Sequence, residues 1–162
     1  MSVNHVIFLA LTTLGLIGGS VTENKHQPRQ TNEEQSIRLF FDDWLEAERA
    51  EDIDRLMEMV DDHCVFLLPG QEPLNGKAAV RTMYERFFLA CKGASIDHRV
   101  SVQDVNIASD YAFFWGRDEL NLTHSTGQVV KAKGYGIGVL RRGADGRWRT
   151  FRSMNNITRQ PS

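Results

Sequence analysis

The second half of the chain contains the feature that most constrains its fold, namely four long strand-like segments joined by short turns. These segments cover residues 96–107, 111–123, 128–142 and 147–157. The breaks between them are rich in residues that favour tight turns: Ser109-Asp110, Ser125-Thr126-Gly127 and Gly143-Ala144-Asp145-Gly146. Strands joined by connections this short are antiparallel neighbours, so we expect an antiparallel meander.

The part of the chain before this meander has helical periodicity instead. Asn32 is a good N-cap, and apolar side chains recur at helical spacing from Ile37 onward, which predicts a first helix. Two further helices are predicted over residues 52–60 and 77–91, with a short strand over residues 64–68 between them. Helices followed by a long meander predict an α+β fold, in which a cone-shaped, curved antiparallel sheet wraps on three helices.

Three glycines alternate along the third long segment. Gly134, Gly136 and Gly138 fall on one face of the predicted strand, because side chains of a strand alternate between its two faces. Missing side chains at these positions let a sheet bend sharply, or let another element approach it closely. We therefore expect strong curvature at this strand.

Composition bounds the classes of function. The chain has 162 residues, of which 41% are apolar, enough for one domain with a core. Its formal net charge of −2 gives no reason to expect a nucleic-acid partner. Cys64 and Cys91 have no ligand-type neighbours at metal spacing, so no metal site is predicted. Two buried free thiols are the favoured interpretation, and one disulfide stays open if the protein is exported.

Residues 1–20 are predicted to be a signal peptide. The apolar run from Val6 to Ile17 has the length of a signal-peptide core and is too short for a bilayer span, so no membrane span is expected in the mature chain. No Lys or Arg precedes Lys25, so an uncleaved anchor remains an alternative. The protein is expected to be exported, periplasmic or extracellular, if this prediction holds, and cytoplasmic otherwise. Residues 21–31 are expected to be a flexible lead-in.

Three pieces of the sequence resemble a known family. The most specific is the stretch from Val65 to Arg81, which has the pattern of a strand, a hairpin and a helix entry of the form G-x-x-A-V-R. Ala108 to Ala112 and Asp145 to Trp148, each at the start of a predicted strand, agree with it. On these pieces, residues 32–159 resemble the nuclear transport factor 2-like superfamily, and within it the SnoaL-like and ketosteroid-isomerase-like domains of the SgcJ/EcaC type.

The resemblance implies a cystatin-like roll with a pocket for a small hydrophobic or amphipathic molecule, and a homodimer formed through the outer face of the sheet. It does not bring the isomerase's catalytic residues with it. The isomerase's oxyanion-hole tyrosine falls at Trp44, its general base at Leu67, and its protonated aspartate at Ile137 or Gly138. Catalysis by that constellation is therefore excluded. No cofactor motif accompanies the resemblance, so no cofactor is expected.

Alignment with the isomerase, combined with strand alternation, predicts which residues face the pocket. His98, Glu119 and Arg117 are the predicted catalytic residues, because a carboxylate can orient and charge a histidine while Arg117 pairs with Glu119. In the alternative interpretation, Arg117 and Glu119 form a structural ion pair and His98 is inert. The predicted ligand-binding residues come from the pocket walls: Trp44, Met57, Met83, Trp115, Tyr135, Phe151, Ser153 and Asn155.

Three functions follow from this interpretation and stay open. The first is a cofactor-free proton-transfer enzyme of the isomerase, dehydratase or cyclase type that acts on a hydrophobic substrate. The second is a binding or carrier protein that uses the same pocket without turnover. The third is a dimerisation module whose pocket is filled by its own side chains. The fold alone does not choose among them, because one fold hosts many functions.

Overall fold

The fold was taken from a computed structural model that describes residues 32–161, so the predicted signal peptide and lead-in lie outside the described residues. None of the helices in this range is long and apolar enough to cross a bilayer. The elements, in chain order, are α1 (Asn32–Arg49), α2 (Ile53–Glu58), β1 (Val60–Leu67), β2 (Leu74–Asn75), α3 (Lys77–Ala90), β3 (Ser95–Ala108), β4 (Tyr111–Thr123), β5 (Val129–Arg142), β6 (Trp148–Asn155) and β7 (Thr158–Arg159).

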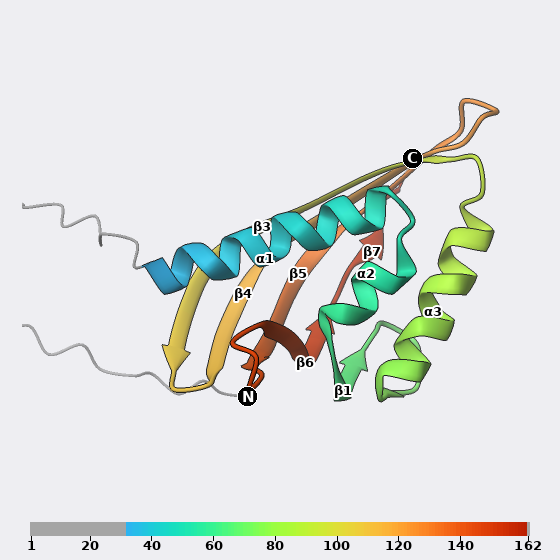
Figure 1. The fold of residues 1–162 in the computed structure, drawn as a ribbon. Coiled ribbons are helices and arrows are strands. Elements are labelled where there is room, and N and C mark those ends of the chain that lie inside the picture. Colours follow the sequence, from blue (N-terminus) through green and yellow to red (C-terminus); the bar gives the residue numbers. More distant parts are fainter. Residues whose placement is uncertain (1–31, 162) are drawn as a thin grey trace, which may run out of the picture.

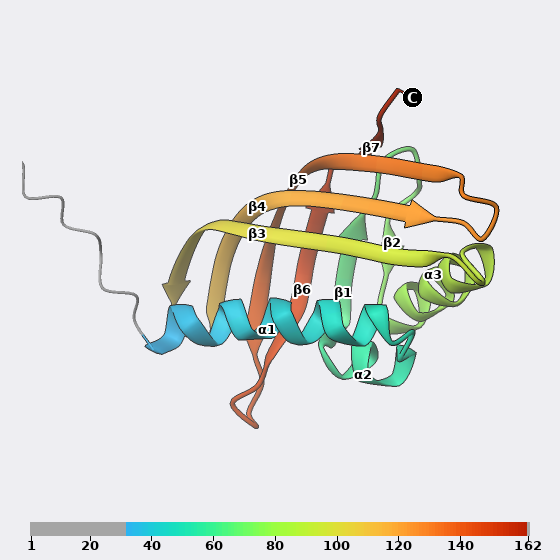
Figure 2. The ribbon, with the colours of Figure 1, turned by 90° about the horizontal axis from the view of Figure 1, so that it is seen from above.

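The strands form one curved sheet in the order β2-β1-β6-β5-β4-β3, with β7 paired to β5. Strands β3 to β6 form the expected antiparallel meander, whereas β1 pairs with β6 in parallel, so the sheet is mixed. The long strands bend along their length, and the three helices lie on the concave side of the sheet (Figures 1 and 2). The predicted α+β roll is confirmed.

Local signals in the sequence start two of the helices. Asp52 caps α2, because its carboxylate accepts a hydrogen bond of 3.0 Å from the backbone N–H of Arg55. Gly76 precedes α3 with a φ of 82°, a left-handed conformation that glycine adopts without a steric penalty. This conformation explains why the G-x-x-A-V-R helix entry begins with glycine.

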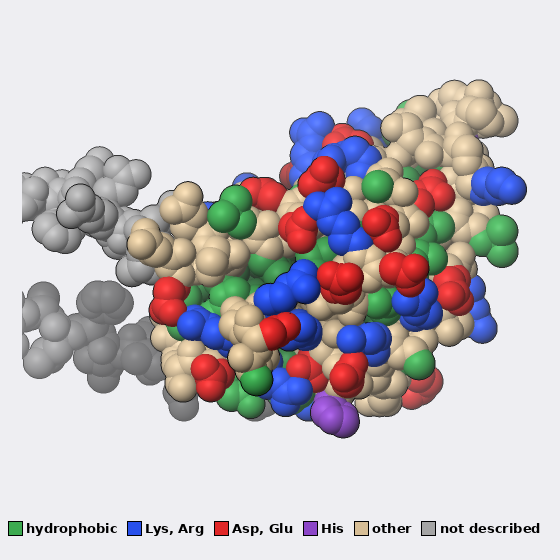
Figure 3. All heavy atoms as spheres, in the orientation of Figure 1, with side chains coloured by type: hydrophobic (Ala, Val, Ile, Leu, Met, Phe, Trp, Pro, Cys, Tyr) green, Lys and Arg blue, Asp and Glu red, His purple; other side chains and the backbone are tan. Residues whose placement is uncertain are grey.

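Charged side chains of both signs are interspersed over the outer surface of the helices (Figure 3). Arg55 of α2 pairs with Asp43 and, at 2.9 Å, with Glu46, and both partners belong to α1. Arg81 of α3 pairs with Asp54 of α2 at 2.7 Å. These pairs are open to solvent, so they contribute little to stability. They show that these acidic residues of the first two helices, Asp43, Glu46 and Asp54, face water.

The core lies between the helices and the concave face of the sheet. Its fully buried side chains include Ile37 of α1, Leu56 of α2, Val80 of α3 and Leu140 of β5, each with a relative exposure of 0%. Burial of apolar side chains from all three helices against one sheet face gives a single core.

β-bulges in β3 and β6 interrupt the regular alternation of side chains. The extra residue is Gln103 in β3 and Phe151 in β6. A bulge opposes two residues of one strand to one of its partner, so the inward and outward positions exchange after it. In β6 this exchange lets both Thr150 and Ser153, three residues apart, border the concave face.

Strand β4 is turned the opposite way from the sequence-based prediction. Phe113 and Trp115 are 49% and 42% exposed on the convex face, whereas Asp118 faces the concave side. The register explains this orientation, because Asp118 lies opposite Val100 of β3 and directly opposed residues of an antiparallel pair share a face. Since Val100 packs against the core, Asp118 also points to that side.

Gly116 and Gly136 lie opposite each other in β4 and β5, but only Gly136 has room for a side chain. A Cβ at Gly116 would come within 2.7 Å of the Ser101 carbonyl oxygen, whereas the nearest atom to a Cβ at Gly136 would be 3.8 Å away. We expect Gly116→Ala to lower the free energy of unfolding by about 1–3 kcal/mol. Gly136→Ala should change it by less than about 0.5 kcal/mol. Urea unfolding of both variants measures the difference, and equal losses would contradict this assignment.

Candidate functional site

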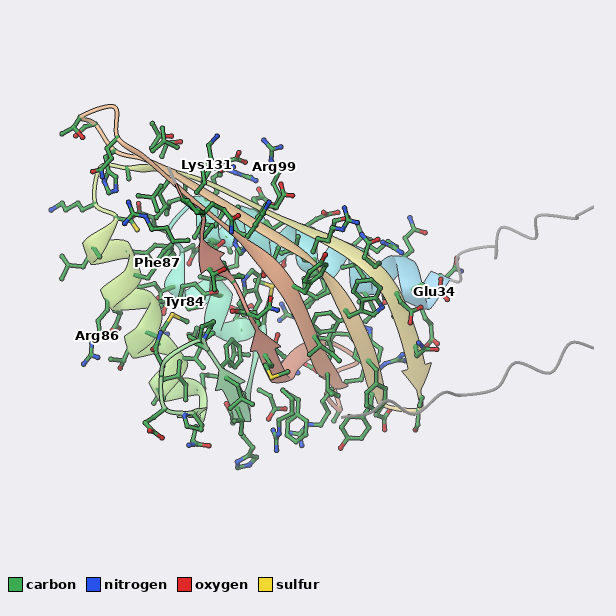
Figure 4. All side chains as sticks on the ribbon, turned by 180° about the vertical axis from the view of Figure 1, so that it is seen from behind. Glu34, Tyr84, Arg86, Phe87, Arg99 and Lys131 are labelled. Carbon is green, nitrogen blue, oxygen red and sulfur yellow. The ribbon has the colours of Figure 1, made fainter. Side chains whose placement is uncertain are left out.

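An apolar cavity of about 420 Å³ opens on the concave side of the sheet. Its walls include Trp44 from α1, Met83 and Phe87 from α3, and Phe114 from β4. Figure 4 shows Tyr84 and Phe87 on the side of α3 that faces the sheet. A cavity of this size with mainly apolar walls suits a small organic molecule.

Three ionisable side chains meet in this cavity. His98 of β3 donates its Nδ1–H to Glu48 Oε2 at the end of α1, and its Nε2–H to Asp118 Oδ1 of β4 at 2.6 Å. The side chains of Glu48, Asp118 and His98 are only 6%, 14% and 16% exposed. We call Glu48, His98 and Asp118 the carboxylate–histidine cluster. The register of β3 and β4 places His98 near Asp118, because Val100, two residues after His98, lies opposite Asp118.

The cluster holds His98 in its charged form. Burial of the ring lowers the pKa of His98, but its hydrogen bonds to Asp118 and Glu48, together with their negative charges, outweigh this effect and raise the pKa to about 10. At neutral pH the cluster is therefore one imidazolium between two carboxylates. An imidazolium donates both of its N–H groups, which matches the two hydrogen bonds observed.

Tyr84 extends the cluster toward α3. Burial raises the pKa of Tyr84 well above its ordinary value, and the neighbouring Glu48 raises it further, so its phenol stays protonated. The rings of Tyr84 and Trp44 pack edge to face, with their centroids 6.1 Å apart. Tyr84 and Trp44 therefore lie in the same cavity wall as the carboxylate–histidine cluster.

The described residues show neither a metal-binding cluster nor an activated cysteine nucleophile. Within residues 32–161, no group of three His, Cys, Asp or Glu side chains is placed to hold a metal ion. Cys64 and Cys91 are both buried and neither is in a disulfide. Burial raises the pKa of both thiols, which disfavours the reactive thiolate.

Comparison with known families agrees with the fold and the cavity. Residues 41–151 match the family model described as the SnoaL-like domain. The chain belongs to the SnoaL-like domain family. No curated protein matches this SnoaL-like domain.

Solved structures of similar proteins share the SnoaL-like domain's fold. A conserved protein from Planctomyces limnophilus is 26% identical with a TM-score of 0.72, over 79% of this chain and 98% of that one. A ketosteroid isomerase-like protein from Erwinia carotovora atroseptica is also 26% identical, with a TM-score of 0.67, over 81% of this chain and 100% of that one. A dehydratase candidate of the NTF2-like family from Streptomyces avermitilis is 18% identical with a TM-score of 0.65, over 75% and 93% of the two chains. At that identity the last comparison supports the fold only.

Six of the residues predicted for the site border the cavity of this SnoaL-like domain. They are His98, Trp44, Met83, Ser153, Asn155 and, at the rim, Arg117. Trp44 and Met83 come from the helices, whereas Ser153 and Asn155 come from β6 beyond its bulge. These placements do not test whether the residues bind or react with a ligand, so their roles remain predictions.

The other predicted residues lie elsewhere. Met57 is 4% exposed and belongs to the core. Trp115 and Tyr135 are 42% and 54% exposed on the convex face, and Phe151 contacts Tyr111 on that face because it is the bulged residue of β6. The expected inward orientation of Trp115, Tyr135 and Phe151 is therefore wrong, whereas Met57 is turned inward but does not border the cavity.

The predicted pairing of Arg117 with Glu119 is also wrong. Both side chains are exposed, because alternation on β4 puts them on the face opposite Asp118. Arg117 borders the rim of the cavity, but no ion pair joins it to Glu119 among the described residues. Neither side chain reaches His98, whose two partners are Glu48 and Asp118.

The sequence interpretation missed Glu48 and Asp118, although each carries a readable signal. Glu48 follows Trp44 by four residues and therefore continues the buried stripe of α1. A carboxylate on an apolar helical stripe needs a buried partner. Phe114, Gly116 and Asp118 are two residues apart along β4 and therefore share one face of the sheet. If one of them faces the concave side, the other two are predicted to do so as well.

The raised pKa of His98 makes stability depend on pH in a defined direction. The pKa rises from 6.5 to about 10 on folding, so the folded protein keeps a proton that the unfolded chain releases between these values. The stabilisation is complete below pH 6.5 and is lost as the pH rises through about 10. We expect the free energy of unfolding to fall by up to about 4 kcal/mol between pH 7 and pH 10. Urea unfolding of the wild type and of His98→Gln should give a clearly smaller fall in the variant, and equal falls would contradict the assignment.

Proposed function

We propose that this SnoaL-like domain catalyses proton transfer on a small, largely apolar molecule without a bound cofactor, as an isomerase, a dehydratase or a cyclase does. The observation that carries this proposal is the carboxylate–histidine cluster at the side of an otherwise apolar cavity. Buried ionised groups cost free energy. Three such groups that border a cavity favour a chemical role over a packing role.

In this proposal Asp118 is the general base. Its Oδ1 accepts the hydrogen bond of His98, which leaves Oδ2 to receive a proton from a substrate. The protonated His98 holds the carboxylate in place, and Glu48 fixes the orientation of the imidazolium. The proton taken from one substrate atom returns to another, or leaves with a hydroxyl group as water, so the reaction needs no further reactant.

The proposal is tested by hydrogen exchange into the substrate. A panel of small cyclic ketones and β-hydroxy ketones is incubated with the protein in D₂O, and deuterium incorporation next to the carbonyl is followed by mass spectrometry. We expect catalysed exchange for a subset of the panel. Asp118→Asn should slow it by about 10²-fold or more, because general base catalysis contributes that much. The matched control Glu119→Gln changes a carboxylate on the exposed face of the same strand and should exchange at the wild-type rate.

Binding without turnover is the second candidate, and one observation favours it. Both N–H groups of His98 are already engaged by carboxylates, as in a satisfied structural network. The same panel separates the two functions. Ligands that raise the melting temperature but show no catalysed exchange would support a carrier function and contradict the proposed catalysis.

The convex face of the sheet favours a homodimer under either function. Six large apolar side chains on it are between 41% and 54% exposed, around a groove of about 350 Å³, and we call them the convex apolar patch: Leu67, Phe113, Trp115, Tyr135, Ile137 and Met154. An exposed apolar patch of this kind marks an interaction surface. A sheet face packs well on a second sheet, so a second copy of this chain is the proposed partner.

Trp115→Glu tests the dimer. A two-fold interface would bring two such carboxylates close together without compensation, so we expect the variant to be monomeric where the wild type is dimeric. Sedimentation velocity at micromolar concentration measures the change. Leu89→Glu is the control, because Leu89 is 73% exposed on α3, away from the convex face, and its variant should stay dimeric. A monomeric wild type would contradict the proposal.

A further inference from the structure

The three alternating glycines of β5 differ in what covers them. A Cβ at Gly138 would meet the Phe114 ring at 2.7 Å, and a Cβ at Gly134 would meet the backbone of Ile157 at 2.8 Å. At Gly136 the nearest atoms would be Asp118 Oδ2 at 3.8 Å and the Met154 carbonyl oxygen at 3.9 Å. Two of the glycines are therefore covered by protein, whereas the middle one leaves open space in the cavity.

This open space adjoins a carboxylate oxygen that has no donor. Asp118 Oδ1 accepts the hydrogen bond of His98, but no hydrogen bond to Asp118 Oδ2 is found among residues 32–161. The Asp118 side chain is only 14% exposed. A carboxylate oxygen shielded to this extent gains free energy from a hydrogen-bond donor.

The charge of the surrounding groups restricts which donor fits. Glu48 and Asp118 are two negative charges, and His98 supplies one positive charge between them. The remaining charged group at the cavity is Arg117, whose side chain is exposed at the rim. A ligand that brought a further negative charge to Asp118 would be repelled in a partly desolvated site.

We infer that Gly136 and Asp118 form a ligand subsite that takes the edge of a flat apolar ring carrying a hydroxyl or ammonium group. The ring lies over the bare backbone at Gly136, between the Phe114 ring and Ile157, and its polar group donates a hydrogen bond to Asp118 Oδ2. Ring carboxylates are rejected. This inference rests on the proposed function only in that it names the same cavity, and it holds for a carrier as well as for an enzyme.

The test uses probes that differ in one substituent. Binding of 2-naphthol, 2-naphthylmethylammonium and 2-naphthoate to the full chain is measured by isothermal titration calorimetry at pH 7. We expect the naphthol or the ammonium probe to bind at least about tenfold more tightly than the carboxylate, because hydrogen bonds to a charged group give a factor of this size. The two favoured probes separate a hydroxyl ligand from a cationic one.

Variants link this preference to the two residues. Asp118→Asn should reduce the preference for the naphthol or ammonium probe over 2-naphthoate to less than about threefold, because the amide carries no charge. Gly136→Ala should weaken the favoured probe slightly and Gly136→Val by about tenfold or more, because the larger side chain fills the open space. Circular dichroism and thermal unfolding show whether each variant is folded, and Leu89→Glu, on the exposed side of α3, should bind as the wild type does.

The outcomes separate this inference from the proposed function. Equal binding of naphthoate and naphthol, unchanged binding by Gly136→Val, or no binding of any probe would overturn the inference even if exchange in D₂O is observed. Tighter binding of the naphthol or ammonium probe than of 2-naphthoate, with the expected changes in the Asp118 and Gly136 variants, would support the subsite. If no exchange occurs in D₂O, the same result would contradict the catalytic proposal.

Discussion

Replacing His98 by leucine should lower the free energy of unfolding by about 3–5 kcal/mol at pH 7, because it removes the charged partner of two buried carboxylates. Glu48 and Asp118 would then remain 6% and 14% exposed with no cation between them. Urea unfolding followed by circular dichroism measures the loss. His63→Leu is the control, since His63 has an exposed side chain at the start of the sheet and should change stability by less than about 0.5 kcal/mol.

A triple variant distinguishes the loss of charge balance from the loss of packing. Replacing Glu48, His98 and Asp118 together by leucine leaves no buried charge in the cluster, so most of the stability lost in the single variant should return. The triple variant should also have lost catalysed exchange, if the wild type has it. Comparable instability of the single and triple variants would mean that the cluster does not act as a balanced set of charges.

Leu140→Ala should lower the free energy of unfolding by about 3–4 kcal/mol, the second largest effect that we expect from a single substitution. Leu140 has a relative exposure of 0% and lies on the concave face of β5 between Ala112 and Thr150, both of which are buried. Truncation therefore leaves a void that the neighbouring strands cannot fill. The midpoint of urea unfolding, at an unchanged slope, measures the loss.

Val129→Ala is the matched control for Leu140→Ala. Val129 belongs to the same strand but is 47% exposed, so its truncation should cost less than about 1 kcal/mol. Similar losses in the two variants would show that strand propensity, and not burial, determines the stability of β5.

The meander and the three helices could be predicted because their signals are local. Ser109-Asp110 and the turn at residues 143–146 separate segments whose ends agree with the strands to within a few residues. Asn32 and Gly76 mark helix starts in the same way. The parallel pairing of β1 with β6 was not predictable from such signals, because residues about 90 positions apart form it.

The prediction of which face of β4 points inward failed for a different reason. Both of its faces carry aromatic residues, Phe113 and Trp115 on one and Phe114 on the other, so alternation separates the faces without saying which is inside. The signal that decides this was in the neighbouring strand, where His98 and Val100 share a face with the core. The bulge at Phe151 changes the phase of β6 and has no sequence signature of its own.

The site could be predicted only in part, since its members come from distant parts of the chain. His98 was identified as a pocket residue, but its partners Glu48 and Asp118 are 50 and 20 residues away in the sequence. The choice between Asp118 and Glu119 depends on a shift of one residue, which moves a side chain to the opposite face. Whether any of these residues is catalytic stays a prediction that the exchange experiment decides.

The place of β6 in the sheet has a consequence for the order in which the protein acquires its structure. Although β6 follows β1 to β5 in the sequence, it lies between β1 and β5 and hydrogen-bonds to both. A nascent chain that has reached only Arg147 therefore has an unpaired edge on β1 and another on β5, and both can bind other chains. The sheet becomes whole only after β6 has been synthesised, so a chaperone that shields these two edges until then would protect it from aggregation.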